Sequence, residues 1–187
     1  MLLALFSTGC ASVQQEQGLR VDLFVQGVDA PSELHAAAVS VRSIQLVPCQ
    51  LAWSPLDLLG TAAHADHSVE SPTTAVFSTS TSLLGMAASA VLHPPPDSWC
   101  YARVVVEPLP DAEDSQLVSV LAESAAGSVS SSRVGWLDLP LDLGLSEDHP
   151  TAQVHLSFSL ADWPAAADAG GDALFETALD AVDVHVR

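Results

Sequence analysis

The sequence predicts an all-β fold: a single antiparallel β-sandwich of roughly seven to nine strands with one or two short helices. Apolar and polar residues alternate with a period of two in segment after segment, which is typical of half-buried strands. Turn-forming residues separate these segments, among them the triple proline at residues 94–96 and the Gly170-Gly171 pair. Of the 187 residues, 49% are apolar and 15% charged, enough apolar material for one core. We expect residues 19–187 to form that domain.

Two strands are predicted near the start of the domain. Residues 19–27 alternate: Leu19, Val21, Leu23 and Val25 point to one face, while Arg20, Asp22 and Gln26 point to the other. Residues 38–49 begin in one phase at Val39 and continue in the opposite phase from Ile44. A change of phase within a strand predicts a β-bulge, here near Arg42-Ser43.

Four further strands are predicted along the rest of the chain. Residues 99–108 are rich in aromatic and β-branched side chains and end at a proline. Residues 134–145 carry leucines on one phase, and the proline among them indicates an edge strand. Residues 154–160 and 182–187 alternate again. The Ser- and Thr-rich residues 73–82 are compatible with either a strand or an exposed loop.

Two short helices complete the expected elements. One covers residues 55–63, after a proline, and the other covers residues 173–181. Asp172 is the candidate capping residue of the second helix, because aspartate at an N-cap accepts a hydrogen bond from a free backbone N–H.

The charge balance excludes several function classes. The chain has 23 acidic residues against five basic ones and a formal net charge of −18, and all five basic residues are arginines. Nucleic-acid binding depends on neutralising phosphates with basic side chains, so we expect no nucleic-acid partner. Attraction to an anionic membrane surface is excluded for the same reason. The absence of lysine excludes Schiff-base chemistry and Walker-type phosphate loops.

The first residues predict a lipid anchor rather than a strand. A short apolar run is followed by Ser7-Thr8-Gly9-Cys10, which resembles the lipobox of bacterial lipoproteins. The resemblance implies that residues 1–9 are the remnant of a signal peptide, that Cys10 is lipidated, and that residues 10–18 form the tether. It also implies a place in the cell envelope of a diderm bacterium, at the outer membrane or in the periplasm. The alternative is an ordinary apolar N-terminus with a free cysteine.

With Cys10 assigned to lipid, Cys49 and Cys100 remain as a pair. An even pair of cysteines in an exported chain is most simply a disulfide. Cys49 lies just after one apolar strand pattern and Cys100 just before another, so a staple between neighbouring strand ends is expected. The alternative is two buried free thiols. No Cys-x-x-Cys motif is present, which argues against redox catalysis.

Three segments resemble small β-sandwich lipoproteins of uncharacterised bacterial families. They read LRVDLFVQGVDAP, VSVRSIQLVPC and SWCYARVVVEP, 35 of the 187 residues. The resemblance implies a β-sandwich fold and names no ligand.

The segment HADHSVE holds the candidate metal ligands His64, Asp66 and His67. Imidazole and carboxylate groups at this spacing suit Cu or Zn, with further ligands supplied by the fold. His155 and His185 lie on the polar phase of their strands. The alternative for all of them is an ordinary polar surface.

No catalytic motif is present: there is no G-x-S-x-G elbow and no H-E-x-x-H. The four tryptophans, at positions 53, 99, 136 and 163, are more readily explained by core packing than by a ligand platform. We therefore expect a non-enzymatic cell-envelope lipoprotein, held at the membrane by its lipid, that acts as a binding or structural module. The alternative function is that of a periplasmic metal-binding protein.

Overall fold

The structure is a computed structural model that describes residues 19–49, 71–110 and 117–187, which form fourteen strands and two helices. In chain order the elements are β1 Arg20–Val28, β2 Leu34–Val39, β3 Val41–Pro48, β4 Thr74–Val76, β5 Thr81–Ser82, β6 Ala88–Leu92, β7 Asp97–Val106, β8 Leu109–Pro110, β9 Leu117–Val118, β10 Val120–Ser124, β11 Gly127–Ser131, β12 Gly135–Leu145, β13 Thr151–Ser159, α1 Trp163–Ala169, α2 Gly171–Asp180 and β14 Val182–Val186.

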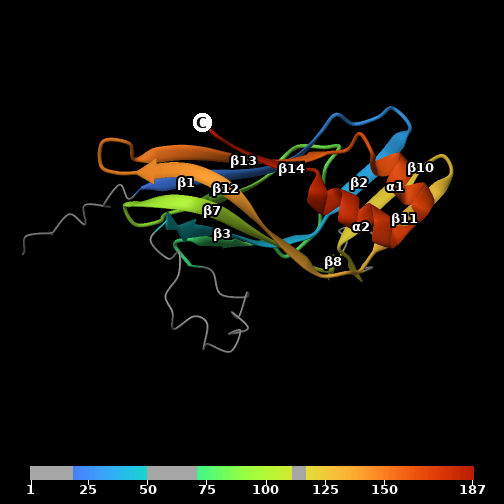
Figure 1. Cartoon of the computed structure of the whole chain (residues 1–187), viewed down its shortest axis with the longest axis horizontal. Coiled ribbons are helices and arrows are strands. Elements are labelled where there is room, and N and C mark those ends of the chain that lie inside the picture. The colour runs from blue at the N-terminus through green and yellow to red at the C-terminus, as the bar shows by residue number, and fades with distance from the viewer. Residues whose placement is uncertain (1–18, 50–70, 111–116) are drawn as a thin grey trace, which may run out of the picture.

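The strands form three four-stranded sheets and one two-stranded ribbon. Sheet A has the order β14-β13-β1-β6, sheet B the order β11-β10-β2-β5, and sheet C the order β12-β7-β3-β4, while β8 pairs with β9. Sheets A and C lie against each other at one end of the elongated molecule, and sheet B lies at the other end with both helices (Figure 1). One core runs through all three sheets, with Leu156 of sheet A, Val39 of sheet B and Val104 of sheet C fully buried in it.

The chain passes from sheet B to sheet C at Ser40, the single residue between β2 and β3. Where a strand changes sheets, its backbone groups need new partners, because a buried unpaired N–H or C=O is costly. Buried serines supply them. The N–H of Ser40 donates to the carbonyl of Ser119 at 2.8 Å, and the Ser40 hydroxyl donates to the carbonyl of Val118. The Ser119 hydroxyl in turn donates to the carbonyl of Ser131 at 2.8 Å.

The expected antiparallel arrangement holds for every strand pairing of the described residues except one. Strand β13 runs parallel to β1 over its whole length, from Arg20 opposite Thr151 to Val28 opposite Ser159. The number of strands also exceeds the expected seven to nine, because predicted segments divide between sheets and several strands have only two or three residues. The β10–β11 hairpin and β6 were not expected, since their many Ala, Ser and Gly residues give weak alternation.

The structure confirms the predicted bulge, the predicted edge strand and the predicted inward side chains of one strand. The register between β3 and β7 shifts between Val41 and Ser43, which confirms the predicted bulge. Strand β12, which contains Pro140, is an edge of sheet C, as a strand with a proline requires. The predicted inward residues of β13, Val154, Leu156 and Phe158, are fully buried, as is Leu160 directly after the strand.

Of the two predicted helices, the second is confirmed as α2, and residues 55–63 lie outside the described residues. The predicted cap is wrong: the N-cap is Gly170, and Asp172 lies in the first turn without a capping hydrogen bond. Helix α2 buries Leu174 and Phe175, and the guanidinium of Arg133 lies 4.9 Å from the centre of the Phe175 ring.

Strand β1 contains a glycine where no larger residue fits. A Cβ added to Gly27 would lie 2.4 Å from the carbonyl oxygen of Leu83 and 2.8 Å from a methyl carbon of Leu160. We expect Gly27→Ala to lower the free energy of unfolding by about 1–3 kcal/mol, as overpacking does. Urea unfolding followed by tryptophan fluorescence measures this. Gly144→Ala on β12 is the matched control, because a Cβ there meets nothing within 4 Å; equal midpoints for the two variants would contradict the prediction.

Candidate functional site

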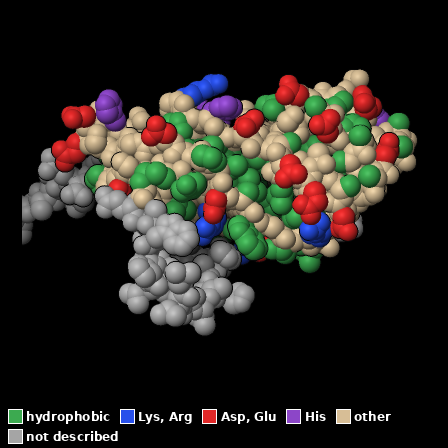
Figure 2. All heavy atoms as spheres, in the orientation of Figure 1, with side chains coloured by type: hydrophobic (Ala, Val, Ile, Leu, Met, Phe, Trp, Pro, Cys, Tyr) green, Lys and Arg blue, Asp and Glu red, His purple; other side chains and the backbone are tan. Residues whose placement is uncertain are grey.

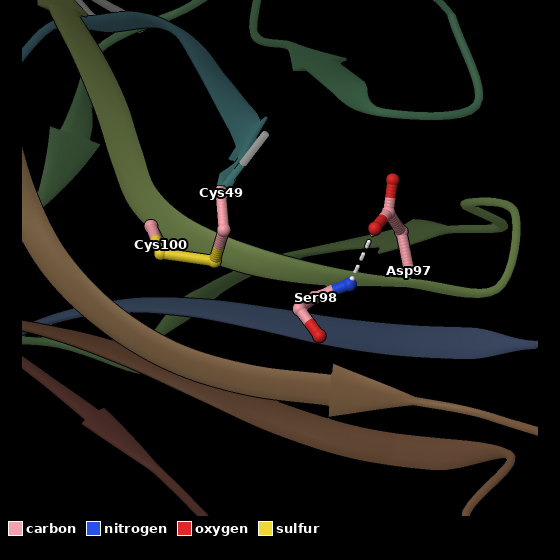
Figure 3. Close-up of a disulfide and its surroundings, with 4 residues drawn as sticks. All are labelled: Cys49, Asp97, Ser98 and Cys100. Carbon is pink, nitrogen blue, oxygen red and sulfur yellow. Dashed lines mark hydrogen bonds between the residues drawn. A yellow bond between two sulfur atoms is a disulfide. The ribbon is translucent and has the colours of Figure 1, made fainter. Parts of the chain in front are cut away.

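The predicted disulfide between Cys49 and Cys100 is present in the structure (Figure 3). Cys49 directly follows β3 and Cys100 lies within β7, and these two strands are antiparallel neighbours in sheet C. The sulfur atoms are 2.10 Å apart and the Cα atoms 4.8 Å apart. Beside it, the N–H of Ser98 donates to the carboxylate of Asp97 at 2.7 Å. The bond therefore staples two neighbouring strands whose cysteines are 51 positions apart in sequence.

The other predicted site residues lie outside the described part of the chain. These are the lipidation residue Cys10 and the metal-ligand candidates His64, Asp66 and His67. Both assignments stay predictions. Within residues 19–49, 71–110 and 117–187, no group of three or more His, Cys, Asp or Glu side chains is arranged to hold a metal ion.

The structure brings two histidines together on the outer face of sheet A. His155 of β13 lies directly opposite His185 of β14 in the antiparallel register. On the other side of β13, Phe24 of β1 lies opposite His155, and the two rings stack with centroids 4.7 Å apart and planes at 18°. The three side chains thus form one row across three strands.

The surroundings lower the pKa of His155 and so favour its neutral form. Burial lowers the pKa of the His155 imidazole, and the positive charges of Arg187 and His185 lower that pKa further. Its Nε2 atom is sheltered from solvent and has no hydrogen-bond partner among the described residues. A neutral imidazole with a free nitrogen is the form that coordinates metals.

The sequence placed both histidines on the polar side of their strands but did not show that they are neighbours. The signal was the shared phase of His155 and His185 with the outward side chains. The pairing was hidden because α1 and α2 lie between β13 and β14 in the chain. The other described histidines stand apart from this pair: a ring nitrogen of His93 lies 3.1 Å from the carbonyl oxygen of Leu19, and His35 and His149 are exposed.

The outer face of sheet C carries exposed aromatic side chains. Trp136 is 70% exposed and Tyr101 is 46% exposed, whereas Trp99 and Trp163 are buried in the core and Trp53 is outside the described residues. The expectation that the tryptophans pack in the core is therefore wrong for Trp136. Successive side chains of a strand point to opposite faces of the sheet. Because Leu137 and the following leucines of β12 point inward, Trp136 points outward.

An ion pair crosses the same face of sheet C. The guanidinium of Arg103 on β7 donates two hydrogen bonds to the carboxylate of Asp138 on β12, at 2.7 and 2.8 Å. These hydrogen bonds raise the pKa of Arg103 and lower the pKa of Asp138. Both side chains are more than a third exposed, so the pair contributes little to stability and mainly orders the face.

Figure 2 shows acidic side chains spread over both ends of the molecule, with few basic ones between them.

No family model, no curated protein and no solved structure matches the chain. Among the described residues there is no helix with the length and apolar character needed to cross a bilayer.

Proposed function

We propose that this chain is a non-catalytic binding or structural module of the cell envelope of a diderm bacterium, tethered to the outer membrane through lipid on Cys10. The module consists of a β-sandwich in which sheets A and C are the two layers. The tether, residues 10–18, holds this domain away from the membrane surface, which repels a chain of net charge −18.

The observation that carries the proposal is the Cys49–Cys100 disulfide. Structural disulfides persist in oxidising compartments such as the periplasm and the cell surface, and are rare in the reducing cytosol. With two of three cysteines so engaged, Cys10 is the odd one. Lipidation accounts for an unpaired cysteine that directly follows a short apolar run and small residues.

A surface for binding is provided by the outer face of sheet C. Aromatic residues are enriched in the surfaces through which proteins bind one another. Trp136 is 70% exposed, and its contact with water is unfavourable unless a partner covers it. Trp136 and Tyr101 flank the ordered Arg103–Asp138 pair there. This arrangement supports a contact role.

Mass spectrometry of the chain isolated from membranes of its native host tests the tether. We expect the mature chain to begin at Cys10, with the added mass of acyl groups, and to partition into detergent. Cys10→Ser is the control: it should block processing and acylation while leaving the Cys49–Cys100 bond intact. A native chain that retains an unmodified Met1 and a free Cys10 thiol would contradict the proposal.

A further inference from the structure

The outer face of sheet A contains two histidines that lie directly opposite each other on neighbouring strands. Gln153 and Arg187 exchange two backbone hydrogen bonds of 2.9 Å each, so His155 and His185, two residues further along each strand, form the next hydrogen-bonded pair of the ladder. Side chains directly opposite in such a pair have Cβ atoms about 4.5–5.5 Å apart. Metal–imidazole bonds of about 2.0–2.1 Å then allow both rings to reach one ion.

The row of three rings prepares His155 for this role. Stacking on Phe24 restricts the rotation of the imidazole, so less side-chain entropy is lost when the ring binds a ligand. The sheltered Nε2 atom has no partner among the described residues, and leaving a polar atom in this state is unfavourable. A coordinated cation would satisfy it without competing against an existing hydrogen bond.

Some charged groups around the pair oppose the binding of a cation, and others favour it. Arg187, next to the pair on the β14 side, opposes a cation, and its effect is already visible in the lowered pKa of His155. Asp183, two residues before His185 on the same face of β14, attracts a cation, as does the net charge of −18 on the whole chain. Asp22 on β1 is engaged with Arg20, their side chains 2.8 Å apart. Arg187 has the largest charge effect on His155 and opposes a cation there, so removing Arg187 should favour metal binding.

We propose that His155 and His185 together bind one divalent transition-metal ion, with Cu(II) preferred over Zn(II), on the outer face of sheet A. Two nitrogen ligands and open positions for water suit the tetragonal coordination of Cu(II), which also binds imidazole more tightly than other divalent ions of its row. This site is separate from the predicted His64–His67 cluster and does not depend on the lipid tether.

The test is a calorimetric titration of the purified full chain with Cu(II), in a His64→Ala/His67→Ala background that removes the predicted cluster. We expect one equivalent of copper to bind, with an electron paramagnetic resonance spectrum that shows coupling to two ring nitrogens. His185→Gln should weaken binding at least tenfold. Because His185 is exposed, this change leaves the core packing in place. Copper should raise the unfolding temperature of the background protein and not that of His185→Gln, because only the folded state joins the two strands.

Two matched variants sharpen the result. His149→Gln changes an exposed histidine in the turn between β12 and β13, six residues before His155, and should leave copper affinity unchanged. Arg187→Gln should strengthen binding several-fold, because it removes a positive charge from beside the site. Equal copper affinity in the background protein and His185→Gln, or no binding in either, would overturn the site. Either of these results would leave the lipid-anchor proposal untouched, since that rests on processing at Cys10.

Discussion

Loss of the Cys49–Cys100 bond is expected to lower the free energy of unfolding by about 4 kcal/mol, since a disulfide closing a loop of this length removes that much chain entropy from the unfolded state. The bond joins positions 51 residues apart and connects the end of β3 to β7 inside sheet C. Without it, the unfolded chain regains freedom while the folded sheet keeps its backbone ladder. Urea unfolding of Cys49→Ser/Cys100→Ser against the parent chain measures the difference.

The control for this prediction is Cys10→Ser, which removes a cysteine outside the bond and should leave the unfolding midpoint unchanged. Reducing the parent chain with dithiothreitol should reproduce the stability of the double variant. A double variant as stable as the parent would show that the bond adds nothing to the folded state.

Trp163→Ala is the second large effect: we expect it to lower the free energy of unfolding by about 3–5 kcal/mol, the usual cost of removing a large aromatic side chain from a core. Trp163 is the first residue of α1 and is fully buried, with Ala166 of the same helix also in the core. Its removal leaves a cavity where α1 joins the core, so the surrounding side chains lose dispersion contacts. Chemical unfolding monitored by far-ultraviolet circular dichroism avoids relying on the fluorophore that is removed.

The matched control is Trp136→Ala, the same substitution at a tryptophan that is 70% exposed on β12. Its effect should stay within about 0.5 kcal/mol, as is usual for surface substitutions. A loss of similar size in both variants would mean that Trp136 contributes to packing and would contradict its assignment to an exposed face.

Much of the local structure could be predicted from the sequence, because a strand with one buried face has an apolar residue at every second position. The alternation over residues 154–160 identified four fully buried apolar side chains, and the change of phase between Val41 and Ile44 identified the bulge. Pro140 marked an edge strand, because a proline cannot donate a ladder hydrogen bond. The cysteine count identified the pair that forms the disulfide, once Cys10 was set aside.

Only part of the candidate site could be predicted from the sequence. The phase of each strand put His155 and His185 on outward faces, whereas Trp136 was expected in the core and is exposed. Which outward residues are neighbours depends on strand order, and strand order leaves no periodic mark on the sequence. The predicted cluster at His64, Asp66 and His67 lies outside the described residues, so the structure neither supports nor opposes it.

The sequence by itself thus determined which side chains of β1 and β13 face the core, where one strand bulges and which cysteines pair. Only the tertiary structure decided that β1 and β13 run parallel, that the chain changes sheets at Ser40, and that His155 meets His185. The physical reason is one of range. Alternation records the contact of each residue with water or core, which is a local property. Strand partners are selected by the closure of long loops and by packing between distant segments, which no short window of sequence contains.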